Sequence, residues 1–208
     1  MKILNLYAGI GGNRKLWGNE HEITAIENNP EIDKIYQDFF PNDKVIVADA
    51  HQFLLEHYKE FDFIWSSPPC PSHSRIRFMA SKSETNKKYE PIFPDLGLYE
   101  EIIFLKHFFK GNWIVENVKP YYEPLVNPTI ILDRHCIWSS FKIIKKEFNK
   151  PEVKHCKVTG KTDRYGISLV NKKLKHRKDQ IIRNCVNPEL SLYVLNSFLE
   201  EQSSGETK

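Results

Sequence analysis

One cysteine and one glutamate stand where short apolar runs of the sequence end. Cys70 follows the run Phe61–Trp65, within residues 66–74 (SSPPCPSHS), and Glu116 ends the run Trp113–Val115. Prolines on both sides hold Cys70 at the start of a polar loop, which is the placement of a nucleophilic thiolate. An inert buried cysteine is the common alternative. If both runs are parallel strands, their ends meet at one sheet edge, and the two side chains form a site for covalent catalysis.

A glycine-rich turn and two acids follow the first three apolar runs. The first run leads into residues 7–12 (YAGIGG), the second ends at Glu27, and the third is followed by Asp49. Glycines let the backbone approach a ligand closely, and carboxylates at neighbouring strand ends bind ribose hydroxyls or a base amino group. Taken singly, the turn is as often tight packing and each acid a helix cap. Together they favour a nucleoside-type cofactor.

The elements that must position these residues alternate in type. Apolar β-type runs predict strands at 2–7, 22–26, 44–47, 61–65 and 113–115, and helical spacing predicts helices near 30–39 and 51–58, after a short helix through Trp17. Residues 130–138 with 141–144 indicate a closing pair of strands. This order is typical of an α/β fold with a mostly parallel sheet and helices on both faces.

Two stretches interrupt the alternation. From Ser67 to about Leu96 the chain has five prolines and no clear periodicity, which predicts a long functional loop. A lysine-rich segment then separates the sheet from a last helix over residues 188–201, and residues 203–208 are expected to be a disordered tail.

The formal net charge of +3 hides two unlike parts. Residues 142–183 carry fourteen Lys or Arg and four acids, a net +10, which leaves −7 for the rest of the chain. Such asymmetry is the usual electrostatic footprint of a segment that binds a polyanion. A solvated lysine-rich surface is the alternative interpretation.

The composition is that of a globular chain of one domain. The 208 residues are 40% hydrophobic, 27% charged and 12% aromatic. No apolar run approaches the roughly 20 residues that cross a bilayer, so we expect no membrane association, and the N-terminus shows no signal-peptide core. The four cysteines form no disulfide framework, so we expect reduced thiols and a cytoplasmic protein.

The ordered motifs resemble those of the DNA (cytosine-5) methyltransferases. Residues 7–12 match that family's Phe-x-Gly-x-Gly-Gly turn, Pro69-Cys70 its Pro-Cys-Gln loop, and Glu116-Asn117-Val118 its Glu-Asn-Val strand end. Asn184-Cys185-Val186 with Pro188 is similar to its late Gly-Asn-Ser/Ala-Val motif. The resemblance covers nearly the whole chain except residues 143–177.

This resemblance implies a Rossmann-like, S-adenosylmethionine-dependent methyltransferase fold. The methionine part of the cofactor would lie against the glycine turn, with its ribose hydroxyls on Glu27 and its adenine amino group on Asp49. Asn184 and Val186 would close the site from the C-terminal side. The cofactor-binding residues implied are Tyr7, Gly9, Ile10, Gly11, Gly12, Glu27, Asn28, Asp49, Ala50, Asn184 and Val186.

The resemblance also implies methyl transfer to carbon 5 of cytosine in duplex DNA, with the base flipped out of the helix. The Cys70 thiolate would add to carbon 6, and Glu116 would hydrogen-bond ring N3 and the exocyclic amine. Asn117 and Arg134 complete the implied catalytic set, with Arg134 on the cytosine carbonyl. The DNA contacts expected are Ser74, Arg75, Arg77, Lys172, Lys173, Lys175 and Arg177.

The chain departs from the family's pattern at several positions. Pro71 stands in place of Gln after the cysteine, Asn5 in place of an Asp, and Arg183 in place of the first glycine of the late motif. Arg134 is the counterpart of a Gln-x-Arg-x-Arg motif. We expect a catalytic core (1–142), a small basic target-recognition insert (143–183), a C-terminal helix returning to the core (184–202) and the tail (203–208).

So small an insert offers few side chains for reading base edges. We therefore expect a short recognition sequence, of roughly two to four base pairs, or a separate specificity partner. A monomeric modification enzyme of a bacterium or a phage, within restriction-modification or as an orphan, fits this size.

Three alternatives stay open. A tRNA cytosine-5 methyltransferase of the same fold would also use a basic surface. A catalytically silent nucleic-acid-binding relative would explain the absent Gln and paired arginines. Metal binding by His135, Cys136, His155 and Cys156 is the third, and we expect no metal because adjacent ligands on one strand point to opposite faces.

Overall fold

The computed structural model describes residues 1–82, 92–148, 163–169, 171–172, 174–175 and 177–205. Within them, seven strands form one sheet in the order β3-β2-β1-β4-β5-β7-β6. Neighbouring strands from β3 to β5 are parallel, and β7 and β6 extend the sheet in antiparallel pairing. The strands are β1 (Lys2–Leu6), β2 (Glu22–Glu27), β3 (Lys44–Val47), β4 (Phe63–Ser66), β5 (Asn112–Val118), β6 (Ile130–Leu132) and β7 (His135–Ser139).

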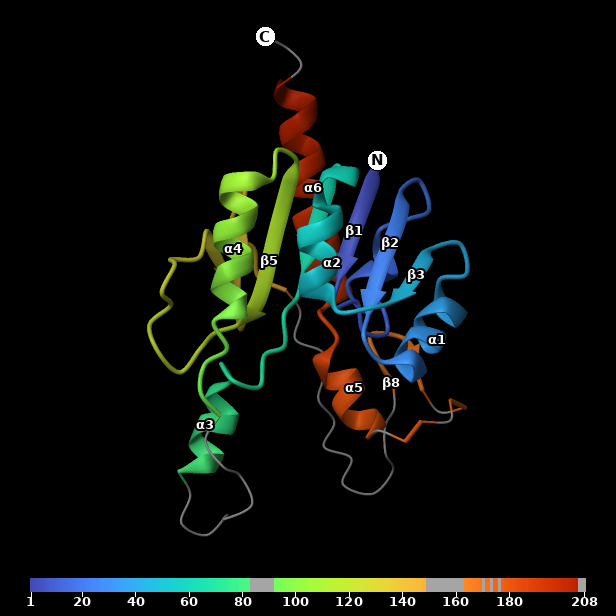
Figure 1. The fold of residues 1–208 in the computed structure, drawn as a ribbon, viewed down its shortest axis with the longest axis vertical. Helices are drawn as coiled ribbons and strands as arrows, with labels where there is room; N and C mark the ends of the chain where they lie inside the picture. The colour runs from blue at the N-terminus through green and yellow to red at the C-terminus, as the bar shows by residue number, and fades with distance from the viewer. Residues whose placement is uncertain (83–91, 149–162, 170, 173, 176, 206–208) are drawn as a thin grey trace.

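Helices cover both faces of this sheet (Figure 1). The helices are α1 (Pro30–Phe39), α2 (Ala50–His57), α3 (Arg75–Ser81), α4 (Gly97–Phe108), α5 (Lys178–Asn184) and α6 (Pro188–Gly205), with short 3-10 turns at Arg14–Leu16 and Tyr58–Glu60. Leu4 of β1 packs with α2 and α4, whereas its neighbour Ile3 packs with α6. This alternation follows from the two-residue period of a strand, and it gives the sheet a core on each face.

The strand order reverses between β1 and β4. The chain runs outward from β1 to β3 and then returns to place β4 and β5 on the other side of β1. In parallel sheets such a reversal opens a crevice at the carboxyl ends of the strands. Figure 1 shows α3, α5 and β8 (Asp163–Arg164) at the end of the molecule toward which the arrows of β2 and β5 point. The expected α/β fold of the Rossmann-like type is therefore confirmed.

A buried ion pair fixes the segment after the glycine turn to α1. The guanidinium of Arg14 donates to Asp43 through Nε at 2.8 Å and Nη2 at 3.0 Å, and Tyr36 of α1 donates its hydroxyl to the same carboxylate at 2.9 Å. Because every charged oxygen has a donor, the cost of burying this pair is offset.

Three sequence expectations for the secondary structure are corrected. The closing pair of strands lies wholly within residues 130–139, because Phe141 and Ile143 are buried under α6 instead of pairing as a strand. The loop between Ser67 and Leu96 contains α3. The last helix continues through Gly205, so residues 203–205 are helical and not a tail, and 206–208 lie outside the described residues.

The sequence does not predict α4, because apolar residues occupy both of its faces. Leu98, Ile102 and Leu105 are buried, while Ile103 and Phe108 are exposed. Within the basic segment, α5 and the hairpin of β8 with β9 (Ile167–Ser168) are also ordered elements. Among the described helices, none is long and apolar enough to cross a membrane.

Candidate active site

The glycine turn after β1 has the left-handed backbone that its sequence suggests. Gly9 and Gly11 have φ of 56° and 76°, and Tyr7 has φ of 55°. A Cβ on Gly11 would collide with the ring of Phe40, so only glycine fits there. A Cβ on Gly9 would meet no atom within 4 Å, so the space beside Gly9 is open. The buried Ile10 anchors the turn between these two glycines.

Glu27 ties the end of β2 to this turn. Its Oε2 accepts the backbone N–H of Gly9 at 3.0 Å and its Oε1 accepts that of Asn29 at 2.9 Å. Burial raises the pKa of this carboxyl, and the backbone donors oppose that shift. Asn28, the residue after it, is exposed. Glu27 thus lies beside Gly9 at the crevice.

Asp49 lies at the corresponding place after β3. It is the N-cap of α2, where its Oδ1 accepts the N–H of Gln52 at 2.8 Å, and Ala50 starts the helix as a buried residue. Asp49 is exposed, so its carboxylate can accept a hydrogen bond from a bound molecule in addition to that from Gln52.

The C-terminal segment closes against the turn at Gly12. Val186 is buried, and Asn184 is the exposed last residue of α5. A Cβ on Gly12 would lie 2.7 Å from Cβ of Cys185 and 3.1 Å from the carbonyl oxygen of Val186. The glycine therefore allows residues 185–186 to lie directly on the turn.

We predict that Gly12→Ala destabilises the protein by about 1–3 kcal/mol, because the added methyl overpacks this contact. Denaturant unfolding measures the loss. Gly97→Ala is the matched control, since its Cβ would meet only Asp95, at 3.2 Å. Equal stability of the two variants would contradict close packing at Gly12.

Cys70 is held near the end of β5 through the loop that precedes it. Asn117 donates from Nδ2 to the carbonyl of Pro68 at 3.0 Å, and its Oδ1 accepts the N–H of Val118 at 2.9 Å. The carbonyl of Cys70 accepts the N–H of His73 at 3.1 Å. The amide of Asn117 therefore locks the end of β5 to the loop that carries Cys70.

Glu116 and Arg134 act electrostatically on the same thiol. Burial raises the pKa of Cys70, the Glu116 charge raises it further, and the Arg134 charge lowers it. Glu116 is buried near the end of β5, with His135 Nε2 at 3.7 Å from its Oε1. Arg134 is exposed in the turn between β6 and β7, and its carbonyl accepts the N–H of Lys119 at 2.8 Å. The fold thus brings together three residues that the sequence analysis assigned to catalysis.

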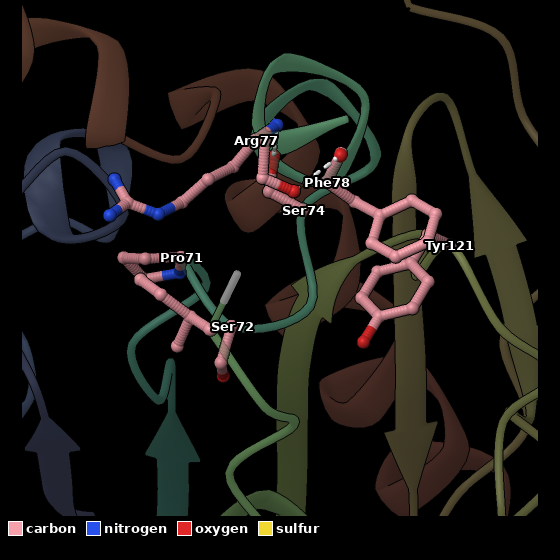
Figure 2. Close-up of a pocket in the computed structure, with 8 residues that line it drawn as sticks. Pro71, Ser72, Ser74, Arg77, Phe78 and Tyr121 are labelled. Atoms are coloured by element: carbon pink, nitrogen blue, oxygen red, sulfur yellow. Dashed lines mark hydrogen bonds between the residues drawn. The ribbon is translucent and has the colours of Figure 1, made fainter. Parts of the chain in front are cut away.

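The expected DNA contacts after Cys70 lie on α3. Ser74 is its N-cap, and Arg75, Ile76 and Met79 are exposed on it. Arg77 lines a small hollow with Ser74 and Phe78, whose ring stacks on Tyr121 at 3.9 Å (Figure 2). A cationic and partly apolar helix therefore follows the candidate nucleophile.

Several cations of the basic segment (142–183) form ion pairs with acids of the same chain, which the net charge of the segment does not show. Lys172 Nζ lies 2.7 Å from Asp38 of α1, and Lys175 Nζ lies 3.9 Å from Glu31 of the same helix. Arg177 pairs with Asp179 at 2.8 Å. Lys173 lies outside the described residues, as do His155 and Cys156 of the metal alternative.

Sequence analysis misses one polar cluster at this edge of the sheet. Glu101 of α4 is fully buried and bonds Tyr7, His51 and Ser66. Two adjacent acids, Glu100 and Glu101, lie within the otherwise apolar residues 98–105, and only the helix shows that Glu101 is the buried one.

The comparisons with known proteins concern mainly the first part of the chain. The model of the family described as C-5 cytosine-specific DNA methylase matches residues 1–120. No curated protein matches the chain.

Similar solved structures include a DNMT2 mutant from Spodoptera frugiperda, 28% identical over 57% of this chain and 35% of that chain, with a TM-score of 0.39. A hypothetical protein of Thermus thermophilus is 15% identical over 66% of this chain and 73% of that one, with a TM-score of 0.45. A putative DNA modification methyltransferase from an Escherichia coli prophage is 15% identical over 59% and 33%, with a TM-score of 0.36. The chain spans about a third of the length of the DNMT2 structure that it matches.

Proposed function

Because the chain belongs to the C-5 cytosine-specific DNA methylase family, we propose that it transfers a methyl group from S-adenosylmethionine to carbon 5 of cytosine in duplex DNA. The observation that carries this proposal is geometric: Asn117, next to Glu116 on β5, bonds the loop that leads to Cys70, and β4, which precedes that loop, lies beside β1, which leads into the glycine turn. It is the arrangement that attack on a cytosine ring next to a bound methyl donor requires.

The residues at the crevice fit S-adenosylmethionine. The open space beside Gly9 allows close approach of a ligand to the backbone, and Glu27 lies at hydrogen-bond distance from that glycine. Glu27 would hold the ribose hydroxyls and Asp49 the adenine amino group, because both are acceptors at adjacent strand ends. The bound cofactor supplies an electrophilic methyl group. Gly9–Gly12, Asn28, Ala50, Asn184 and Val186 would form the remaining walls.

Cys70 and its neighbours would make carbon 5 of cytosine nucleophilic. The Cys70 thiolate would form a bond to carbon 6, while Glu116 would share a proton with ring N3 and accept from the exocyclic amine, and Arg134 would donate to the ring carbonyl. Electron density would then move to carbon 5, which would take the methyl group and leave S-adenosylhomocysteine. A base would remove the carbon-5 proton, and the electron pair of that C–H bond would restore the double bond between carbons 5 and 6 as the thiolate leaves and frees Cys70. Asn117 keeps the Cys70 loop in place through Pro68.

Base flipping would use α3, next to Cys70. A cytosine inside a duplex is out of reach of any thiol, so it must leave the stack. Proteins that open base steps often insert apolar side chains, and Ile76 and Met79 are 80% and 72% exposed on α3. Ser74, Arg75 and Arg77 would contact the flanking phosphates.

We predict that Arg75→Gln and Lys175→Gln each lower the slope of log affinity against log salt by about 0.9, the contribution of one phosphate contact. The Lys175 side chain is 90% exposed, so its pairing with Glu31 is weak. Lys172→Gln should have a smaller effect, since Asp38 already neutralises Lys172 at 2.7 Å. Salt titrations of duplex DNA binding measure all three. An unchanged slope in Lys175→Gln would assign the basic segment to a solvated surface, and one in Arg75→Gln would remove α3 from the DNA contacts.

Bisulfite sequencing of DNA from cells that express the protein tests the function directly. We expect methylated cytosines in a short sequence context, as a small recognition region with few base-reading side chains predicts. Purified protein is assayed in parallel on duplex DNA and on tRNA. Transfer to tRNA alone would replace DNA by RNA as the substrate, and transfer to neither would favour a silent relative. A cytoplasmic, monomeric modification enzyme of a bacterium or phage, with or without a specificity partner, completes the proposal.

A further inference from the structure

Glu101 is a fully buried carboxylate that the proposed reaction does not use. It lies on α4, whose buried neighbours Leu98, Ile102 and Leu105 form the core over one face of the sheet. An ionised carboxylate in such surroundings is costly unless several donors satisfy it. The groups that donate hydrogen bonds to Glu101 therefore indicate which parts of the fold hold its carboxylate in the core.

Three donors from three different elements meet on this carboxylate. Tyr7, the residue after β1, donates its hydroxyl to Oε1 at 2.5 Å, and Ser66, the last residue of β4, donates to Oε2 at 2.6 Å. Nδ1 of His51 in α2 lies 3.2 Å from Oε1. The hydrogen bond to Glu101 raises the pKa of His51 against the opposing effect of burial, and the charges of Glu101, Glu100 and Asp49 add smaller increases, so a protonated ring that donates is favoured.

The bond to Tyr7 constrains a strained residue. Tyr7 has φ of 55°, a left-handed conformation that side chains other than glycine rarely adopt. Such strain persists only where surrounding contacts determine the conformation. Here the backbone of Ala8 donates to Ile26 at 3.0 Å on one side, and the Tyr7 hydroxyl is fixed by Glu101 on the other. The left-handed residue starts the turn that leads to Gly9–Gly12.

The hydrogen bond from Ser66 connects Glu101 to the strand that precedes Cys70. Ser66 is fully buried, and four residues later the chain arrives at Cys70 through Ser67 and two prolines. One carboxylate therefore joins the strand that leads into the cofactor turn to the strand that leads to the nucleophile. The neighbouring Glu100 has no comparable role, because its side chain is 65% exposed and its contact with His51 Nε2 is longer, at 3.6 Å.

We propose that Glu101 is a positioning residue that holds Tyr7 and Ser66 and so sets the cofactor turn in register with the Cys70 loop. The part that concerns Cys70 rests on the proposed function, whereas the part that concerns the cofactor turn does not. Tyr7 differs by one hydroxyl from the phenylalanine of the family's motif, and that hydroxyl is the group that Glu101 binds.

Calorimetric titration with S-adenosylhomocysteine and S-adenosylmethionine tests the proposal. Tyr7→Phe and Glu101→Gln should each weaken binding at least about tenfold, the effect of losing a hydrogen bond to a buried charge. The double variant should bind no more weakly than Glu101→Gln, since both changes act on the same bond between Tyr7 and Glu101. Glu100→Gln, one residue away, should bind like the parent. Parental affinity in Tyr7→Phe would overturn the proposal.

Two further readouts separate positioning from a general loss of stability. In Glu101→Gln the NMR titration of His51 should shift to lower pH, because its main partner has lost its charge; an unshifted titration contradicts the contact. Ser66→Ala should slow covalent trapping of Cys70 by 5-fluorocytosine DNA about tenfold, with cofactor affinity kept. If the unmutated protein forms no adduct, the proposed function is wrong. The cofactor titrations then still test whether Glu101 positions the cofactor turn. Tyr7→Phe keeps the experiment decisive if Glu101→Gln does not fold.

Discussion

Cys70→Ser is expected to lower methyl transfer at least roughly 10³-fold, as loss of a nucleophile does in other enzymes. A serine hydroxyl is far less nucleophilic than a thiolate, and the carbon-6 adduct then fails to form. Binding of S-adenosylmethionine should stay nearly parental, because Cys70 is held by the Asn117 contact with Pro68 and not by the glycine turn. Radiolabel transfer to duplex DNA and calorimetry measure the two quantities.

Covalent trapping on DNA that contains 5-fluorocytosine identifies the cysteine sulfur that attacks the cytosine ring. With the fluorine in place of the carbon-5 proton, the adduct at Cys70 should persist and be located by peptide mass spectrometry. Cys185→Ser is the matched control, because Cys185 is buried and donates its thiol to Ile181. Persistent methylation by Cys70→Ser would show that the nucleophile assignment is wrong.

Glu116→Gln is expected to change both the maximum rate of methyl transfer and the pH dependence of covalent trapping. The maximum rate should fall roughly 10²–10⁴-fold, the usual range for loss of a positioned acid or base. The pH profile of trapping should move toward lower pH, because the Glu116 charge raises the pKa of Cys70 and its removal lowers it.

The direction follows from the protonation state of the thiol. A raised pKa means that the thiolate is the minor form at neutral pH and grows as the pH rises, so the parent's trapping rate should increase from neutral into alkaline pH. Arg134→Gln should move the profile toward higher pH, because its cation lowers the pKa of Cys70. Stopped-flow or quench trapping across pH checks both shifts. Profiles that move together, or not at all, would contradict the charge arrangement around Cys70.

The five parallel strands were predicted because an apolar β-type run is a local signal, whether the strand is buried, as β1 and β4 are, or lies at the edge of the sheet, as β3 does. Lys44–Val47 and Pro30–Phe39 have the predicted bounds, and the chain turns after β1 as its glycines indicate. The assignment failed where apolar residues carry no single period, as in α4, or where a short helix lies among prolines, as in α3. Tertiary packing selects α4, which buries several residues, whereas α3 buries none and begins at the local N-cap Ser74.

The charge distribution, too, could be predicted from the sequence only in part. A sum over residues 142–183 predicts a cationic surface, and the sequence shows the number of its charges. It does not show that Lys172 and Lys175 lie against acids of a helix more than a hundred residues away. Charges that pair within the chain contribute less to binding of a phosphate backbone than free ones do.

The sequence by itself determined which residues end the strands, and with them the chemistry available: a thiol, three acids and a glycine turn at one sheet edge. That followed because strand ends and turns are local, and parallel strands present their carboxyl ends together. Only the tertiary structure decided how the turn and the Cys70 loop are held in register. Glu101, His51 and Ser66 lie far apart in sequence, and only folding brings their side chains within hydrogen-bond distance. A buried carboxylate and its donors become recognisable once the core around them is known.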